Sequence, residues 1–487
     1  MKDQTGYLCV DSGVRARRNF DSWFIYKTSR FLRYETNEVG IHLLRMCNGL
    51  TTMSQALKQA SEKIGIEKSV AFEFLSQLMQ EGIVKVVSSP RQQKVKIFDD
   101  IGPSWVVLHI TNQCNLKCQH CYVNASSRRF DVMPIETVKS VLSQLEAIGT
   151  IDVIVTGGEP TIHPQFAEVM NFIKQLGMSS EILTNGTLID QDVAHHLADI
   201  GVTQVLVSLD SSVPSIHDKL RGVKGAWKSA VQGIRNLKNA GVKIIANTVI
   251  YRHNLDDLPN MFSLLSDLSV DVWRLGTLFY VGRAANNQKI KVSVQENMKV
   301  LQHLDDLYMK GNWSFMLSTT LDWEALAFSD DELAERRHFC GMTMGKHLYI
   351  RANGDVLVCD RLPNLIAGNI YKETISDIWG KDIIKRWKIH SRVEEIPDCA
   401  ACKWKYLCGA GCRANAYRFG DGYFSPDPIA CASMVSLEEN WDNIPTKVQN
   451  RLQLYISRAE NTGATNDAWL VQASSDKISQ QGGKNRE

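Results

Sequence analysis

Six short β-rich runs alternate with amphipathic helices between residues 104 and 278, and this alternation restricts the possible folds more than any other feature of the sequence. Connections long enough to hold a helix are those that join parallel strands, since antiparallel neighbours need only a short hairpin. We therefore predict an α/β fold with a partial (β/α)6 TIM-like barrel and bridging helices over residues 104–335, in preference to an open doubly wound sheet. The expected strands are 105–110, 153–156, 181–184, 204–208, 243–249 and 271–275, and the expected helices lie near 134–148, 165–176, 190–200, 225–240 and 256–268.

Charge and hydropathy exclude several kinds of partner. The 487 residues include 55 Lys and Arg and 53 Asp and Glu, so the net charge of +2 gives no reason to expect nucleic acid or an anionic membrane as a partner. No apolar run reaches the roughly 18 residues that a membrane span requires, and the first residues lack a secretion signal. We therefore expect a cytoplasmic protein. Its twelve cysteines then favour metal or redox chemistry over disulfides, because the cytosol keeps thiols reduced.

Three of these cysteines follow the first expected strand directly. The segment TNQCNLKCQHCY places Cys114, Cys118 and Cys121 in a C-x3-C-x2-C spacing. Three thiolates on one loop can bind three irons of a [4Fe-4S] cluster and leave the fourth iron open to a substrate or cofactor. The alternative is a closed tetrahedral zinc site completed by His120.

This loop resembles that of the radical S-adenosylmethionine (SAM) enzymes, in which an aromatic residue often precedes the third cysteine. His120 stands at that position here, and Tyr122 follows Cys121. The resemblance implies that the open iron chelates SAM and that a 5'-deoxyadenosyl radical released from SAM abstracts hydrogen, while the protein positions the cofactor.

The resemblance also implies a set of SAM-binding residues at the ends of successive strands, where barrel active sites lie. They belong to the TGGEP turn, the TNGT and SLD segments and the HDKLRG segment; the alternative is that they are caps, turn residues or, for the arginine, a solvated surface side chain. The expected cofactor-binding residues are Gly157, Gly158, Glu159, Pro160, Asn185, Ser208, Asp210 and Arg221.

A second group of cysteines occupies residues 336–440, which we expect to form a cysteine-rich domain. Its spacing is C-x13-G-x4-C followed by C-x2-C-x5-C-x3-C-x18-C, and it resembles the SPASM extension of radical SAM enzymes, which carries two auxiliary iron-sulfur clusters. The resemblance assigns Cys399, Cys402, Cys408 and Cys431 to one cluster and Cys340, Cys359 and Cys412 to the other. The second cluster then needs a non-thiolate ligand, a smaller cluster or an open iron. Two structural zinc sites are the alternative.

Three further residues are interpreted from their positions relative to these patterns. Asp360 follows Cys359, and in sulfatase-maturing relatives an aspartate at that position accepts a proton from the substrate. Asp360 is therefore a candidate catalytic base, with a surface carboxylate as the alternative. Cys9 and Cys47 lie outside both patterns and are expected to be ordinary buried thiols.

Residues 1–90 are expected to form a winged-helix-like α+β module. Strand-like patches at 14–18, 23–28 and 30–35 precede helical patterns at 36–47, 53–64 and 70–80. The module resembles the PqqD-like recognition elements of enzymes that modify ribosomally synthesised peptides. That resemblance implies that an edge strand near 31–35 and the last helix bind a leader peptide as an added strand. The alternative is a winged helix for interaction or dimerisation; DNA binding is disfavoured because the segment SVAFEFLSQLMQEG contains no Lys or Arg.

Together these features predict a radical SAM enzyme that binds a precursor peptide or small protein and installs an intramolecular crosslink, as subtilosin-type thioether maturases do. A Cys-sulfur-to-carbon thioether is the simplest product, and a reductant such as flavodoxin or ferredoxin would supply electrons. The alternatives are carbon-carbon crosslinking, thioether formation in an amine dehydrogenase subunit, formylglycine formation on sulfatases, and a catalytically silent peptide-binding scaffold that holds zinc. Residues 91–103 are expected to be a linker, and 441–487 a helix followed by a disordered tail.

Overall fold

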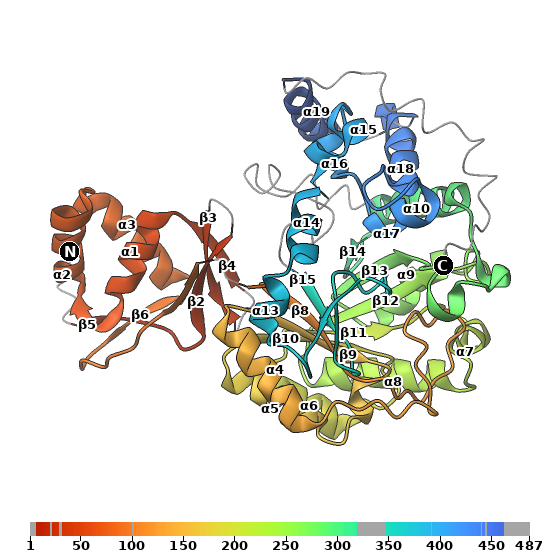
Figure 1. Ribbon diagram of the computed structural model, residues 1–487, viewed down its shortest axis with the longest axis horizontal. Coiled ribbons are helices and arrows are strands. Elements are labelled where there is room, and N and C mark those ends of the chain that lie inside the picture. Colours follow the sequence, from red (N-terminus) through yellow and green to blue (C-terminus); the bar gives the residue numbers. More distant parts are fainter. Residues whose placement is uncertain are drawn as a thin grey trace.

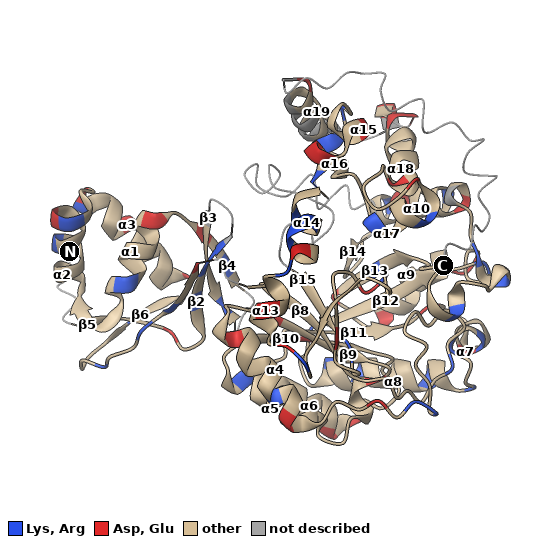
Figure 2. Cartoon of the chain, viewed as in Figure 1, with Lys and Arg blue, Asp and Glu red and all other residues tan. Residues whose placement is uncertain are grey.

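The computed structural model describes residues 6–19, 22–28, 32–99, 102–318, 347–390, 392–439, 441–443 and 446–461. An N-terminal module lies to one side of a large α/β domain, and a mainly helical C-terminal part lies across a second side of that domain (Figure 1). Lys and Arg are interspersed with Asp and Glu over all three parts, in keeping with the small net charge (Figure 2). No described helix combines the length and the apolar character that crossing a bilayer requires.

The N-terminal module contains two small sheets and three helices around a core that includes Leu8, Ile25, Ile41, Leu44 and Leu75. One sheet has the strand order β5-β1-β6 and the other the order β4-β3-β2-β7. The helices are α1 (Glu38–Met46), α2 (Met53–Gln59), which continues as one π turn, and α3 (Lys68–Gln80). The strands are β1 (Tyr7–Val10), β2 (Val14–Asn19), β3 (Ser22–Lys27), β4 (Leu32–Thr36), β5 (Asn48–Thr52), β6 (Val84–Val87) and β7 (Lys96–Asp99).

Strand β7 lies inside the segment expected to be a linker. It returns to the N-terminal module and pairs in parallel with β2, so the module extends to Asp99. Strands β1, β5 and β6 were not expected. β1 precedes the first predicted strand, β5 lies between two predicted helices, and β6 follows the last of them.

The large domain is built on six parallel strands in the order β13-β12-β11-β10-β9-β8, which confirms the predicted α/β fold. The bounds of β11 are the expected ones, and those of the other five strands differ by at most two residues at either end. The strands are β8 (Trp105–Thr111), β9 (Asp152–Gly157), β10 (Ser179–Thr184), β11 (Gln204–Ser208), β12 (Ile244–Ile250) and β13 (Val272–Thr277). Such runs of apolar residues, buried on both faces, are typical of parallel strands covered by helices.

Four further strands extend this sheet beyond the barrel. On one side β14 (Met316–Ser318) pairs with β13; on the other, β15 (His347–Ile350) pairs in parallel with β8 and continues into antiparallel β16 (Asp355–Leu357) and β17 (Ile366–Asn369). Strands from the cysteine-rich segment therefore belong to the same sheet as the barrel, which places Cys359 beside the strands that carry the first cysteine loop.

The barrel helices are α4 (Ile135–Ala147), α5 (Phe166–Gln175), α6 (Gln191–Ile200), α7 (Pro214–Arg221), α8 (Ala226–Asn239), α9 (Met261–Asp267) and α10 (Val294–Lys310). Local signals define their ends: Asp190 caps the N-terminus of α6, and Gly201, with φ of 76°, ends it. Ser293 and Glu296 form a capping box at the start of α10. The C-terminal helices are α13 (Ile375–Trp379), α14 (Asp382–His390), α15 (Pro397–Ala400), α16 (Lys405–Cys408), α17 (Arg413–Phe419), α18 (Pro428–Glu439) and α19 (Thr446–Asn461). The tail expected to be disordered lies outside the described residues.

Two buried arginines of β2 join the N-terminal module to the barrel. Arg17 is fully buried and donates to the carbonyl oxygens of Gly149 (2.7 Å) and Gly102. Arg15 donates to the carbonyl of Leu176 and pairs with Glu146 at 3.2 Å. Leu176 and Gly149 lie at the C-terminal ends of α5 and α4, where unpaired carbonyls and the helix dipole favour a cation. The module is therefore docked at the end of the barrel where the strands begin.

Candidate active site

The first cysteine loop lies between β8 and α4, at the carboxyl end of β8. Cys114 and Cys118 are buried and Cys121 is half-buried, and all three belong to one small apolar cluster. Burial raises the pKa of Cys114 to about 12 and also raises the pKa of Cys118. Buried thiols of this kind ionise when a metal takes the sulfur, so the donor set fits an iron-sulfur cluster.

His120, which would complete a zinc site in the alternative interpretation, is neutral in this structure. Its Nδ1 is buried and makes no hydrogen bond, and burial lowers the pKa of the ring to about 3. Within the described ranges, no group of three or more His, Cys, Asp or Glu side chains is arranged to hold a metal ion. A cluster does not need such convergence on one ion, because each of its irons takes one thiolate.

Three glycines allow neighbouring segments to approach the cysteine loop closely. A Cβ atom on Gly158 would lie 2.1 Å from the carbonyl oxygen of Gln113, one on Gly222 would lie 2.6 Å from that of Lys117, and one on Gly282 would lie 2.4 Å from that of Cys121. No side chain fits at such distances. The loop is therefore enclosed by the ends of β9, α7 and β13.

Hydrogen bonds fix the same loop from the side of α7 and the segment after β13. The backbone N–H groups of Lys117 and Gln119 donate to the carbonyls of Arg221 (3.0 Å) and Leu220 (2.8 Å). Arg283 donates from Nε to the carbonyl of Cys118 at 2.7 Å and from Nη1 to that of Ala125 at 2.8 Å. Arg283 was not predicted as a site residue, because a single arginine after a strand belongs to no spacing pattern.

The GGEP turn lies against this loop. The N–H groups of Gly158 and Glu159 donate to the carbonyls of Thr111 (2.7 Å) and Gln113 (2.8 Å). Gly157 has φ of 152°, and a Cβ there would lie 2.2 Å from the Thr111 oxygen. Pro160 is buried and opens a short 3-10 turn. The turn and the start of the cysteine loop thus form one hydrogen-bonded unit.

The carboxylate of Glu159 is fully buried and joins the ends of β9 and β10. Its Oε2 accepts from the backbone N–H of Asn185 (2.7 Å), and its Oε1 accepts from the hydroxyls of Thr161 and Thr184 (2.7 Å each) and the N–H of Thr161 (3.3 Å). Burial raises the pKa of Glu159, while these donors oppose the shift. The side chain of Glu159 therefore holds the ends of β9 and β10 together beside the cysteine loop.

Asn185 and Ser208 lie at the carboxyl ends of β10 and β11, as expected. The Asn185 amide donates to Oδ1 of Asn115 at 2.9 Å and lies 3.9 Å from Sγ of Cys114. Ser208 is half-buried at the last position of its strand. Asn185 is thus in direct contact with the cysteine loop.

Asp210 and Arg221 form a buried ion pair beside Cys118. Nε of Arg221 donates to Oδ2 of Asp210 at 2.7 Å, and Nη1 lies 3.9 Å from Sγ of Cys118. Burial opposes the charge on Asp210, but Arg221 and the neighbouring His217 and His120 rings outweigh it and lower the pKa of Asp210. The solvated-surface alternative for Arg221 is wrong, because only 6% of this residue is exposed.

Asp360 is also buried, so the alternative of a surface carboxylate is wrong for this residue. Its Oδ2 lies 3.1 Å from Nε2 of His109 on β8, its Oδ1 accepts from Nη2 of Arg351 at 3.0 Å, and Tyr122 of the cysteine loop hydrogen-bonds to it. Burial would raise the pKa of Asp360, but these partners lower it to about 2. Asp360 links the first cysteine loop to Cys359. Its partners His109, Tyr122 and Arg351 belong to no spacing pattern that would have predicted these contacts.

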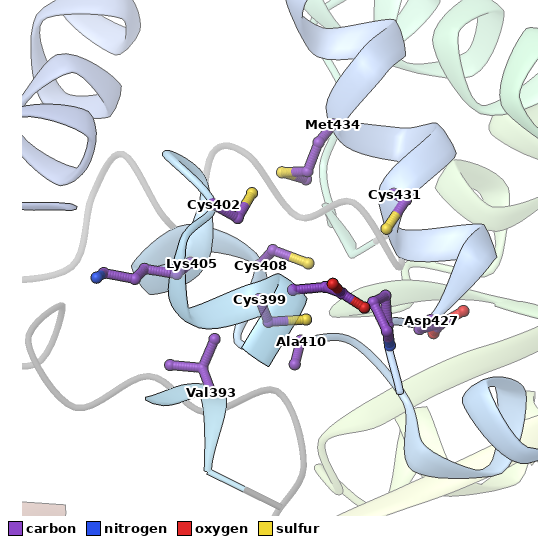
Figure 3. A pocket seen from close by; sticks show the side chains of 11 residues that line it. Val393, Cys399, Cys402, Lys405, Cys408, Ala410, Asp427, Cys431 and Met434 are labelled. Atoms are coloured by element: carbon purple, nitrogen blue, oxygen red, sulfur yellow. The ribbon is translucent and has the colours of Figure 1, made fainter. Parts of the chain in front are cut away.

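Four of the C-terminal cysteines line one cavity. Cys399 and Cys402 come from α15 and the residues after it, Cys408 from the end of α16 and Cys431 from α18, and Asp427 and Met434 complete part of the wall (Figure 3). Burial raises the pKa values of Cys399 and Cys431 to about 12. The cavity brings together the four cysteines expected to share one auxiliary cluster.

Cys412 and Cys359 do not line that cavity, although the backbone N–H of Cys412 donates to Oδ2 of the cavity residue Asp427 at 2.8 Å. Both cysteines have Arg361 as a neighbour. Arg361 donates from Nη1 to Sγ of Cys412 at 3.4 Å, and the charges of both thiolates act on its guanidinium. Cys340, the third cysteine expected at this site, lies outside the described residues. Cys9 and Cys47 are buried in the N-terminal module, as expected.

Comparison with known proteins identifies two regions. Residues 108–265 match the Radical SAM superfamily, and residues 340–403 match the iron-sulfur cluster-binding domain SPASM. The chain is similar to Fe-coproporphyrin III synthase of Methanosarcina barkeri, with 28% identity over 67% of this chain and 87% of that protein. It is also similar to the sporulation killing factor maturation protein SkfB of Bacillus subtilis, with 28% identity over 58% of this chain and 65% of that protein.

The fold is similar to that of Streptococcus suis SuiB, solved with its precursor peptide SuiA. The TM-score is 0.65 at 16% identity, and the match covers 87% of this chain and 99% of that one. The matched share of this chain is larger than the part that follows Asp99, so the match includes part of the N-terminal module.

Proposed function

Because the chain is a radical SAM enzyme that carries an iron-sulfur SPASM domain, we propose that it binds a precursor peptide and crosslinks it, most simply by joining a cysteine sulfur to carbon. The radical SAM domain binds a [4Fe-4S] cluster and SAM, and the SPASM domain binds auxiliary iron-sulfur clusters. In this proposal Cys114, Cys118 and Cys121 bind the first cluster. The four-cysteine cavity holds one auxiliary cluster, and Cys359 and Cys412, with Cys340, hold the other.

The N-terminal module carries the peptide part of this proposal. Its strand β4 is the last strand on one side of its sheet, and Tyr34 on β4 contacts Phe74 on α3 with ring centroids 6.0 Å apart. An edge strand beside a helix can take up an extended peptide as an additional strand. The edge strand and the helix beside it support a leader-binding role of the kind expected for a PqqD-like recognition element.

The proposed reaction balances as a two-electron oxidation of the peptide. When bound, SAM supplies a 5'-deoxyadenosyl group that takes a hydrogen atom from a peptide carbon, at the cost of one electron from a reductant of the flavodoxin or ferredoxin class. The C–S bond then forms as the cysteine thiol loses its proton and one electron leaves toward an auxiliary cluster. In this chain, Asp360 is the proposed acceptor of that proton, and its Oδ2 lies 3.1 Å from Nε2 of His109.

Similarity to Fe-coproporphyrin III synthase favours a second candidate, a tetrapyrrole substrate. That match covers 67% of the chain, whereas the match to the peptide-bound SuiB fold covers 87% and reaches into the N-terminal module. The module thus favours the peptide.

The proposal is tested on anaerobically reconstituted full-length protein. Iron, sulfide and zinc are measured per chain, and 5'-deoxyadenosine release is compared with that of a variant in which Cys114, Cys118 and Cys121 are alanine. The protein is then co-expressed with short cysteine-containing reading frames adjacent to its own gene, and the peptides are analysed by mass spectrometry. Loss of two hydrogen atoms from a peptide, dependent on the three cysteines, is the expected result.

Other outcomes overturn the proposal. Consumption of an iron porphyrin with matching deoxyadenosine release, and no change in any peptide, would establish the tetrapyrrole alternative. Zinc in place of iron with intact SAM would leave a binding scaffold. A peptide altered without a bond to sulfur would retain the substrate class and exclude the thioether.

A further inference from the structure

Arg361 lies at the junction of the barrel and the C-terminal part, next to two of the expected auxiliary-cluster cysteines. It follows Cys359 by two residues, and its Nη1 donates to Sγ of Cys412 at 3.4 Å. Its Cζ lies 3.5 Å from the centre of the Phe279 ring, just after β13. The guanidinium is therefore stacked on the barrel with one N–H directed at a cluster thiolate.

Arg361 carries a positive charge, because a guanidinium does not lose its proton in proteins. Arg361 is partly enclosed, so its charge is screened less than that of a surface arginine. The carboxylate of the neighbouring Asp360 contacts His109 and Arg351.

Both features of Arg361 act on an iron-sulfur cluster in the same direction. Reduction adds one negative charge to a cluster, and a nearby positive charge stabilises the reduced form more than the oxidised form. A hydrogen bond to a ligand sulfur withdraws electron density from it and has the same effect. An arginine that provides both raises the reduction potential of the cluster.

The carboxylate of Asp427 is shared by the two auxiliary sites. It forms part of the wall of the four-cysteine cavity, and its Oδ2 accepts from the backbone N–H of Cys412 at 2.8 Å. The feature that distinguishes the site of Cys412 is therefore the guanidinium of Arg361, which donates to the cysteine sulfur.

We propose that Arg361 sets the reduction potential of the auxiliary cluster held by Cys359 and Cys412, and makes that cluster the first acceptor of the electron released when the peptide bond to sulfur forms. This inference rests on the proposed function for the origin of that electron. The role of Arg361 itself requires only that the two cysteines bind a cluster. Arg361 is a positioning and tuning residue, because nothing in the structure brings it to the reacting atoms.

The test is a redox titration without peptide or SAM. The background is full-length protein with Cys114, Cys118 and Cys121 replaced by alanine, so that only auxiliary clusters remain, and their reduction is followed by electron paramagnetic resonance. Arg361→Gln removes the charge and the stacking, and Arg361→Lys retains the charge. Arg418→Gln is the matched control, because Arg418 is exposed on α17, lies 5.7 Å from the Tyr280 ring and has no thiol partner among its described contacts.

The expected result for Arg361→Gln is an unchanged iron content and a lower potential for one cluster. The equilibrium between its reduced and oxidised forms shifts at least about tenfold, which corresponds to about 59 mV for one electron. The potential of the second cluster stays unchanged and serves as an internal reference. The potential in Arg361→Lys is expected to lie between those of the parent and Arg361→Gln, and the potential in Arg418→Gln is expected to equal that of the parent.

Equal potentials in the parent, Arg361→Gln and Arg361→Lys at full iron content would overturn the inference. Loss of one cluster from both Arg361 variants would also overturn it and assign Arg361 a purely structural role. If Arg361→Gln alone loses the cluster, the reduction potential of the cluster in Arg361→Lys becomes the test. A potential below that of the parent supports the inference, and a potential identical to that of the parent excludes tuning by the stacked guanidinium. Because the titration contains no peptide, its result remains interpretable if the peptide proposal fails. Zinc in place of iron would overturn both the proposed function and the role of Arg361.

Discussion

Replacing Glu159 with glutamine tests whether this buried carboxylate organises the predicted SAM site. The two carboxylate oxygens accept four hydrogen bonds, from the N–H and hydroxyl of Thr161, the hydroxyl of Thr184 and the N–H of Asn185. A glutamine can keep its oxygen toward Asn185 only by turning its NH2 group toward the two threonines. Their hydroxyls can rotate to accept, but the N–H of Thr161 cannot.

The magnitude follows from these contacts. One buried N–H without an acceptor costs about 1–3 kcal/mol, and the remaining hydrogen bonds lose their charge assistance. Relief from burying a carboxylate offsets part of this loss, so the net cost is about 1–3 kcal/mol. Opening of the β10 end then becomes roughly 5 to 150 times more frequent.

Hydrogen exchange measures this opening directly. The amides of Asn185 and Thr187 are expected to exchange faster by that factor in Glu159→Gln, and the variant should retain SAM less well. Glu168→Gln is the control, since Glu168 pairs with Lys139 on the exposed face of α5 and its loss costs little. Exchange rates equal to the parent in both variants would refute the reasoning.

Three further changes probe other parts of the molecule. Arg17→Met removes a buried cation from two carbonyls and should weaken docking of the N-terminal module by about 3 kcal/mol, seen as faster proteolysis between residues 99 and 104, whereas Arg18→Met should not. Asp360, with its pKa lowered from 3.8 to about 2, contributes of order 2 kcal/mol of stability above pH 4 that is lost as the pH falls toward 2; Asp360→Asn should abolish this dependence, and an unchanged acid transition would contradict it. Cys431→Ala should lose about four irons per chain, and Cys47→Ala none; equal iron content in both would exclude the four-cysteine site.

The sequence predicts the barrel well because its physics is local. Strand β11 was predicted without error, and the other barrel strands differ by at most two residues, since short apolar runs separated by helices leave little freedom. Strand β7 was missed because it has only four residues, with one apolar pair between two charged residues, and it is held as a strand by its pairing with β2. The pattern VRARR indicated a strand but not that two of its arginines are buried against helix ends.

The candidate site likewise has residues that the sequence predicts and residues that it does not. Spacing identifies the cysteines, because ligands to one cluster lie close together along the chain. It does not reveal that Arg221 is buried against Asp210 and Cys118, or that Asp360 meets His109 across 251 positions of sequence. Such pairs depend on which strand ends lie side by side, and that is a property of the folded sheet.

The N-terminal module is docked at the end of the barrel opposite the cysteine loop, and this sets the distance between the two. Arg15 and Arg17 fix the module where the strands begin, and the charge of Arg33 on β4 reaches Asp152 at the start of β9. The cysteine loop lies at the opposite end of β8, seven residues away, a span of roughly 23 Å at about 3.3 Å per residue. If the proposed peptide binds at β4, at least about seven extended residues must span the distance from β4 to the cysteine loop. The length of that spacer would then determine which peptide residue is the first that can be modified.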